Sequence, residues 1–121
     1  TNRLVGSEMC IRDRFDTEDK FGSETDLLIT DMKKASALAD FLVDSDVALM
    51  RGHGATIYGR TLPEAVYRAI YAELNAQILL NSAAMGAFKA LSVGECKATV
   101  ERISPQIGRA WDLWVREVER D

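Results

Sequence analysis

The sequence has few of the residues from which many functional sites are built: two cysteines, Cys10 and Cys96, and a single histidine, His53. Two cysteines so far apart indicate neither a disulfide framework nor a Cys-x-x-Cys metal clip. We interpret them as unrelated thiols, and Cys96 as a small side chain packed within a helix. Chemistry, if the chain performs any, must be argued from the stretch around His53.

Long apolar runs and an excess of basic charge are absent as well. No uninterrupted apolar run approaches the roughly 20 residues of a membrane span, and no basic-then-apolar leader opens the sequence. The 15 basic residues are scattered among 19 acidic ones, whereas phosphate binding needs clustered Lys and Arg. We therefore expect a cytoplasmic protein with no nucleic-acid or membrane partner. The 121 residues, 47% of them hydrophobic, suffice for one core, so they predict one domain or part of one.

The beginning of the sequence has a non-biological explanation. Residues 8–14 read Glu-Met-Cys-Ile-Arg-Asp-Arg, and the sequencing-library transposon end GAGATGTGTATAAGAGACAG encodes Glu-Met-Cys-Ile-Arg-Asp, with Arg permitted next. We therefore assign residues 1–14 to a non-native, adaptor-derived segment and residues 15–121 to the natural domain.

The first half of the natural chain predicts a short extended segment, a helix and a hairpin. A short strand or extended segment is expected at residues 26–30, and Thr30 is expected to cap a helix over residues 31–43. The apolar face of that helix is Met32, Ala35, Leu38, Ala39 and Leu42. Two short apolar runs, at residues 47–51 and 55–58, flank a Gly-His-Gly corner, as the strands of a buried hairpin would.

The second half predicts three helices. Thr61-Leu-Pro-Glu64 is a capping box that starts a helix over residues 62–85, which Gly86 ends. A second box, Ser92 to Glu95, opens a helix through about residue 102. Ser104-Pro105 starts the last one, with an apolar face of Ile107, Ala110, Trp111, Trp114, Val115 and Val118. Side chains off the main stripe of the long helix indicate two partners for it, one of them another subunit.

Four stretches together resemble the class II aldolase and adducin head-domain family. They are Asp26-Leu-Leu-Ile, Leu49-Met-Arg-Gly-His-Gly54, Tyr58-Gly-Arg-Thr-Leu-Pro-Glu-Ala65 and Arg68-Ala-Ile-Tyr-Ala-Glu-Leu-Asn-Ala76. The similarity runs from about Phe15 to the end of the sequence and covers the second half of the family's domain. The Arg-Gly-His-Gly corner followed by a capped helix is the most specific part of it.

The resemblance implies an α/β fold: a fragment of a three-layer α/β/α architecture with a mostly antiparallel central sheet, here a β-hairpin plus about four helices. It also implies a divalent metal, zinc or alternatively manganese, held by three histidines in a homotetramer. His53 matches the third metal histidine. The other two form a His-x-His pair upstream that this sequence lacks, as it lacks the catalytic acid/base glutamate, so no catalytic residue and no other cofactor-binding residue is assigned. From the sequence alone, a structural role of His53 at the turn stays open.

The chemistry implied by the resemblance is that of a metal-dependent lyase. Aldol cleavage and decarboxylation both develop an enolate that a metal can stabilise. The expected substrate is a small hydroxy-carbonyl compound or hydroxylated acid. The fragment itself is expected to be inactive because the remaining ligands are missing. The alternative is a non-catalytic adducin-like interaction domain, which a His-x-His pair in the upstream gene segment would exclude.

Overall fold

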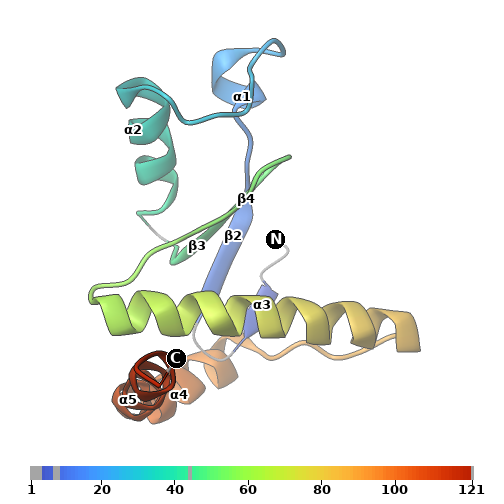
Figure 1. The fold of residues 1–121 in the computed structure, drawn as a ribbon. Helices are drawn as coiled ribbons and strands as arrows, with labels where there is room; N and C mark the ends of the chain where they lie inside the picture. The colour runs from blue at the N-terminus through green and yellow to red at the C-terminus, as the bar shows by residue number, and fades with distance from the viewer. Residues whose placement is uncertain (1–3, 7–8, 44, 121) are drawn as a thin grey trace. The chain divides into compact units, whose positions relative to one another are not determined.

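The computed structural model describes residues 4–6, 9–43 and 45–120, with side chains from Arg14 onward. It contains both strands and helices, so the predicted α/β class is confirmed. The chain order is β1 (Leu4–Gly6), β2 (Met9–Phe15), α1 (Glu18–Phe21), α2 (Met32–Phe41), β3 (Val47–Met50), β4 (Gly54–Ile57), α3 (Leu62–Met85), α4 (Val93–Ile103), the 3-10 turn η1 (Ser104–Gln106) and α5 (Ile107–Val118) (Figure 1). Within the described residues, no helix is long and apolar enough to cross a membrane.

The chain divides into two compact units, which we describe separately. Most of the first is Cys10–Tyr58, and most of the second is Gly59–Asp121. Strands β3 and β4, strand β2 from Cys10 onward, and helices α1 and α2 therefore belong to the first unit. Helices α3, α4 and α5 belong to the second.

The sheet of the first unit is centred on β3. Val47–Met50 pairs antiparallel with Gly54–Ile57, so the predicted hairpin is confirmed, and β3 also pairs in parallel with β2. Of these two strand pairings, β3 with β4 is antiparallel and β2 with β3 is parallel. Val47 and Ala48 have no exposed surface, and because neighbouring residues of a strand point to opposite faces, both faces of β3 are covered.

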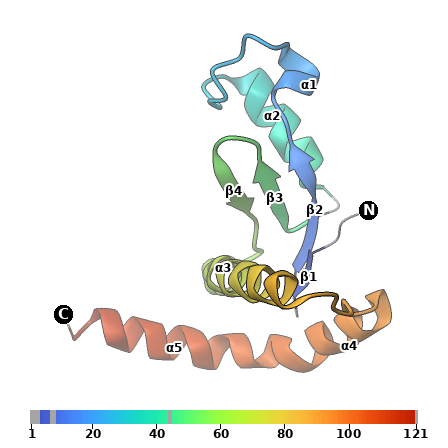
Figure 2. The same ribbon diagram turned by 90° about the vertical axis from the view of Figure 1, so that its right-hand side faces the viewer.

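Helix α2 covers one face of this sheet (Figure 2). Its Ala37 joins Phe15 of β2 and Ala48 and Met50 of β3 in the core, and the Phe41 ring meets the Phe15 ring edge-on at 5.6 Å. The predicted apolar face was wrong in part, since Met32 is 80% exposed whereas Ala37, which we did not assign to the face, is buried. The cap is also one residue later than predicted: Asp31, not Thr30, accepts the amide of Lys34.

The extended segment expected at residues 26–30 is not a strand. Local hydrogen bonds replace a ladder there: the Thr25 hydroxyl accepts the amide of Leu27, and the Asp26 carboxylate accepts the amide of Leu28. Such side-chain contacts give the backbone an alternative to sheet pairing. The segment that precedes it contains the four-residue helix α1.

The long helix of the second unit begins and ends where the sequence predicts. The Thr61 hydroxyl accepts the amide of Glu64, and the helix runs from Leu62 to Met85 with Gly86 after it. The Glu64 carboxylate reaches back one residue further than in a capping box, to the amide of Arg60. Gly59 is required before this turn, because a Cβ there would lie 2.4 Å from the backbone nitrogen of Ala65.

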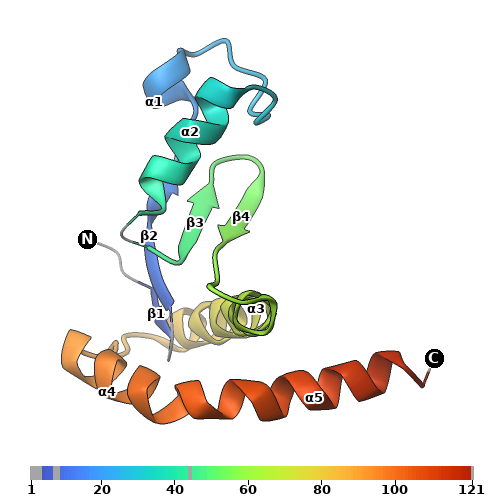
Figure 3. The same cartoon turned by 90° about the vertical axis from the view of Figure 1, so that its left-hand side faces the viewer.

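The helix after Ser92 matches its prediction closely, whereas α5 begins at Ile107, after η1, and not at Ser104-Pro105. Ser92 and Glu95 form a complete capping box at the start of α4, and η1 leads from α4 into α5 as a nearly continuous helical run (Figure 3). Of the predicted apolar face of α5, five residues are half-buried and Val118 is 76% exposed. Helix α5 contacts α3. Within α3, the Tyr67 and Tyr71 rings stack with their centroids 4.4 Å apart, and the Tyr67 centroid lies 6.1 Å from the ring centroid of Trp114 on α5.

The segment assigned to the adaptor is described only in part. Residues 1–3 and 7–8 lie outside the described part, and residues 9–14 belong to β2. A strand conformation does not reveal which nucleotides encode it. The division at residue 14 therefore stays a prediction.

Candidate functional site

The only histidine lies at the tip of the β3–β4 hairpin. Residues 51–53 form the turn, and the amide of His53 donates to the carbonyl of Met50 at 3.2 Å. The His53 side chain is exposed, whereas the strand that precedes it is the most buried part of the chain. An exposed imidazole therefore stands on a rigid support, which is what a ligand or a proton-transferring group requires.

Gly52 allows the hairpin to turn so tightly. Its φ of 69° lies in the left-handed region that glycine adopts without strain. A Cβ at this position would also lie 2.8 Å from Cδ1 of Leu27. Leu27 thus packs directly against the turn that carries His53, and only a glycine leaves room for it.

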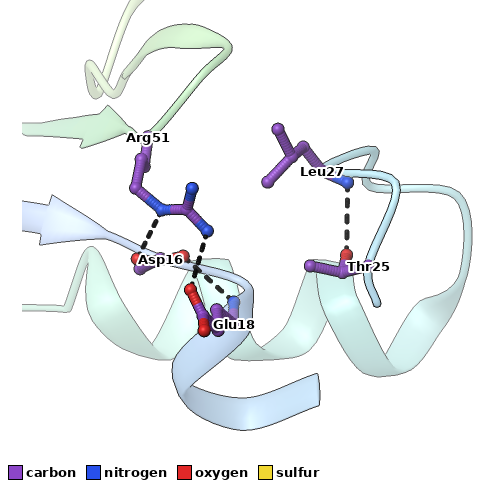
Figure 4. Close-up of polar contacts among 5 residues, drawn as sticks. All are labelled: Asp16, Glu18, Thr25, Leu27 and Arg51. Carbon is purple, nitrogen blue, oxygen red and sulfur yellow. Dashed lines mark hydrogen bonds and ion pairs between the residues drawn. The ribbon is translucent and has the colours of Figure 1, made fainter. Parts of the chain in front are cut away.

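Arg51 ties the same turn to the beginning of α1. Its Nε donates to Asp16 at 2.6 Å and its Nη2 to Glu18 at 3.2 Å (Figure 4). The second oxygen of Asp16 accepts the amide of Glu18 at 3.0 Å, which orients the carboxylate. The Arg51 amide donates to the carbonyl of Phe15, so backbone and side chain are held by the same short segment.

The charges of this cluster perturb each other's pKa values in the directions that pairing requires. The hydrogen bond from Arg51 lowers the pKa of Asp16 below its ordinary value, with the Glu18 amide contributing in the same direction. The hydrogen bond to Asp16 raises the pKa of Arg51 further above its already high value. Both groups are therefore charged at neutral pH.

A second ion pair anchors the loop that contacts Gly52. Lys34 of α2 lies 3.6 Å from the Asp26 carboxylate. The amide of Leu28 is the main cause of the lowered pKa of Asp26, and Lys34 adds to it. Hydrogen bonds from the amides of Leu27 and Leu28, to Thr25 and Asp26, also hold this part of the loop.

The described residues do not form a complete metal site. No group of three or more His, Cys, Asp or Glu side chains in the described ranges could hold a metal ion. His53, the predicted metal ligand, is one imidazole, and the carboxylates of Asp16 and Glu18 are engaged by Arg51. A metal of the predicted kind therefore does not fit the donors present here without further ligands.

The sequence indicated the corner but not what holds it. It singled out His53 and the glycines beside it, and the structure places them at one exposed tip. It did not indicate the pairing of Arg51 with Asp16 and Glu18, which lie 35 and 33 residues away. The parallel pairing of β2 with β3 brings them together. The available signal was the pair of acidic residues at the beginning of α1, shortly after β2.

Comparison with known proteins gives two matches that include this hairpin or the region around it. Residues 5–80 match the family model described as the class II aldolase and adducin N-terminal domain. The decarboxylase tropJ of Talaromyces stipitatus is 43% identical over 84 residues. That alignment covers 60% of this chain and 32% of the relative, so the chain spans about a third of the length of the curated relative it matches.

Proposed function

Because the chain belongs to the class II aldolase and adducin N-terminal domain family, we propose that it is the C-terminal portion of a family lyase. Its similarity to a protein named a decarboxylase favours carbon–carbon bond cleavage over a non-catalytic, adducin-like role. The proposed reaction is aldol cleavage or decarboxylation through an enolate. The proposed substrate is a small hydroxy-carbonyl compound or a hydroxylated acid, and the decarboxylase name supports the acid.

We further propose that His53 supplies one of the metal ligands in the assembled protein. The observation that carries this is the position of the imidazole, exposed at a glycine-flanked tip that follows a strand in which Val47 and Ala48 are fully buried. A histidine that served only the core would be expected to bury its ring against apolar neighbours. Zinc is the first expectation and manganese the second, because neutral imidazole binds both.

A divalent metal, when bound, would supply a Lewis acid that stabilises the developing enolate oxygen. The residues described here contribute the support for one ligand, and they do not supply a set of three. The remaining ligands and the acid/base group would come from outside this sequence. The 121-residue chain alone is therefore proposed to be inactive, and a homotetramer is proposed for the assembled protein.

The test joins residues 15–121 to an upstream family segment that contains a His-x-His pair. His53→Asn is the decisive variant, because asparagine tolerates a turn and keeps a polar side chain but does not replace imidazole as a ligand. We expect it to lose most of the bound metal and of the lyase turnover. Stability should change by less than about 1 kcal/mol, as for an exposed side chain. Lys33→Gln, on the exposed side of α2, is the control and should keep both.

Two outcomes would count against the proposal. Retention of metal and turnover by His53→Asn would return His53 to a structural role at the turn. Absence of metal and turnover from the parent protein, with the fold intact by circular dichroism, would favour the adducin-like alternative.

A further inference from the structure

We infer that Arg51 is a positioning residue, which fixes the turn that carries His53 by pairing with Asp16 and Glu18. The inference deepens the proposed function, since it names what holds the proposed ligand in place. It stands on three observations from one unit of the chain: the double ion pair of Arg51, the contact of Leu27 with Gly52, and the backbone conformation of Leu27.

The neighbours of Arg51 argue against a direct role in binding an anionic substrate. Its guanidinium donates to two carboxylates, at 2.6 Å and 3.2 Å. Two negative charges therefore offset its single positive charge, and an incoming carboxylate or phosphate would meet a net negative cluster. A guanidinium engaged through both Nε and Nη2 is instead suited to orienting the segment that bears it.

The attachment is at the base of the turn, two residues before His53. The Arg51 amide donates to the carbonyl of Phe15 at 3.1 Å, and the Arg51 side chain donates to the carboxylate of the next residue, Asp16. Backbone and side chain of one residue thus hold the same short segment. This restricts rotation of the turn about the hairpin axis, which a single hydrogen bond would not.

Leu27 supports the turn from its other side. Its Cδ1 occupies the space that a side chain at residue 52 would need. Leu27 is also the one non-glycine residue with positive φ in the described part of the chain, at 67°. Such a conformation costs a leucine free energy and persists only where the surroundings impose it, which is commonest at functional sites. Here it directs an apolar side chain at the turn next to the proposed ligand.

Hydrogen exchange in the 121-residue chain tests the positioning without any metal. Two turn amides are the readouts, those of Arg51 and His53, which donate to Phe15 and Met50. At low salt, Arg51→Gln should raise their exchange rates about two- to fivefold relative to the amides of β3, the range expected for a partly exposed ion pair. Arg51→Lys keeps a charge but not the double contact, so it should restore part of the protection.

Two further variants separate positioning from general stability. Arg60→Gln makes the same substitution at an exposed arginine of the other unit and should leave the turn amides unchanged. Leu27→Ala removes the contact beneath Gly52 and keeps both ion pairs, so it should also speed exchange at the turn. Raising the salt to about 1 M should shrink the effect of Arg51→Gln and spare that of Leu27→Ala, because only charges are screened.

The outcomes distinguish this inference from the proposed function. Unchanged turn exchange in Arg51→Gln, equal acceleration throughout β3, or a parent chain with no protection at the turn would each overturn the inference. A failure of His53→Asn to release metal in the joined protein would overturn the ligand role and leave the exchange result standing. If both hold, Arg51→Gln in the joined protein should weaken metal binding without abolishing it.

Discussion

Asp16 is the residue at which the charge cluster responds to pH. Its carboxyl has a pKa below the ordinary value in the folded chain because Arg51 and the Glu18 amide favour the charged form. A group whose pKa is lowered by folding stabilises the folded state above its unfolded pKa. That contribution is lost as the pH falls through the lower, folded value. Asp26 has a pKa lowered in the same direction, mainly by the Leu28 amide.

We therefore predict that the urea concentration at the midpoint of unfolding decreases once the pH is lowered below about 4, where ordinary aspartates protonate. Asp16→Asn should lower the midpoint at neutral pH and reduce the drop in acid, since asparagine cannot titrate. Asp26→Asn should do the same independently. Identical acid profiles for the parent and the Asp16→Asn,Asp26→Asn double variant would show that other carboxyls control the transition.

The sequence could identify His53 but not the residues that hold it. A glycine-flanked histidine between two apolar runs is recognisable from spacing alone. The partners of Arg51 are set by which strands pair and in what register, and spacing does not encode that. Leu27 was also beyond prediction, because leucine has no intrinsic preference for positive φ and only its surroundings impose it.

At the scale of elements, prediction succeeded where the signal is local. The capping residues of α3 and α4 and the glycine after α3 act within one helical turn, and the structure has them where the sequence predicts. The segment at residues 26–30 failed because Thr25 and Asp26 bond their own neighbours. The predicted face of α2 was wrong in part: Leu38 and Leu42 pack against the core, whereas Met32, at the N-terminal end, is 80% exposed.

Loss of the capping hydroxyl should affect stability differently at α3 and at α4, because the two helices differ in how far they are buried. Helix α4 has no buried residue, whereas α3 buries Tyr67. Removal of a capping hydroxyl typically costs about 0.5 to 2 kcal/mol. We predict that Ser92→Ala speeds amide exchange within α4 with little change in the global urea midpoint, while Thr61→Ala lowers the midpoint of the unit. Ser92→Thr keeps the hydroxyl and is the control; equal global effects of the two alanine variants would contradict this.

At the scale of the whole chain, apolar surface is left uncovered along α3. Apolar residues four apart form a stripe along this helix, which is half-buried at Val66 and Ile70. Further along the same helix, Leu74 is 45% exposed and Ile78 61%. An exposed apolar stripe of this kind often marks a site that binds another protein surface. The expectation of a second partner for this helix is consistent with that.

We predict that the 121-residue chain self-associates through this part of α3 as its concentration rises into the micromolar range and above. Ile78→Lys should shift sedimentation toward the monomer and reduce binding of an apolar dye, since it places a charge within the stripe. Gln77→Lys adds the same charge at the neighbouring exposed position, off the stripe, and should leave association nearly unchanged. Equal effects of the two variants would indicate general charge repulsion, and a parent chain that remains monomeric without binding dye would contradict the prediction. In the homotetramer proposed for the assembled protein, we expect the same stripe to be the surface that a second subunit covers.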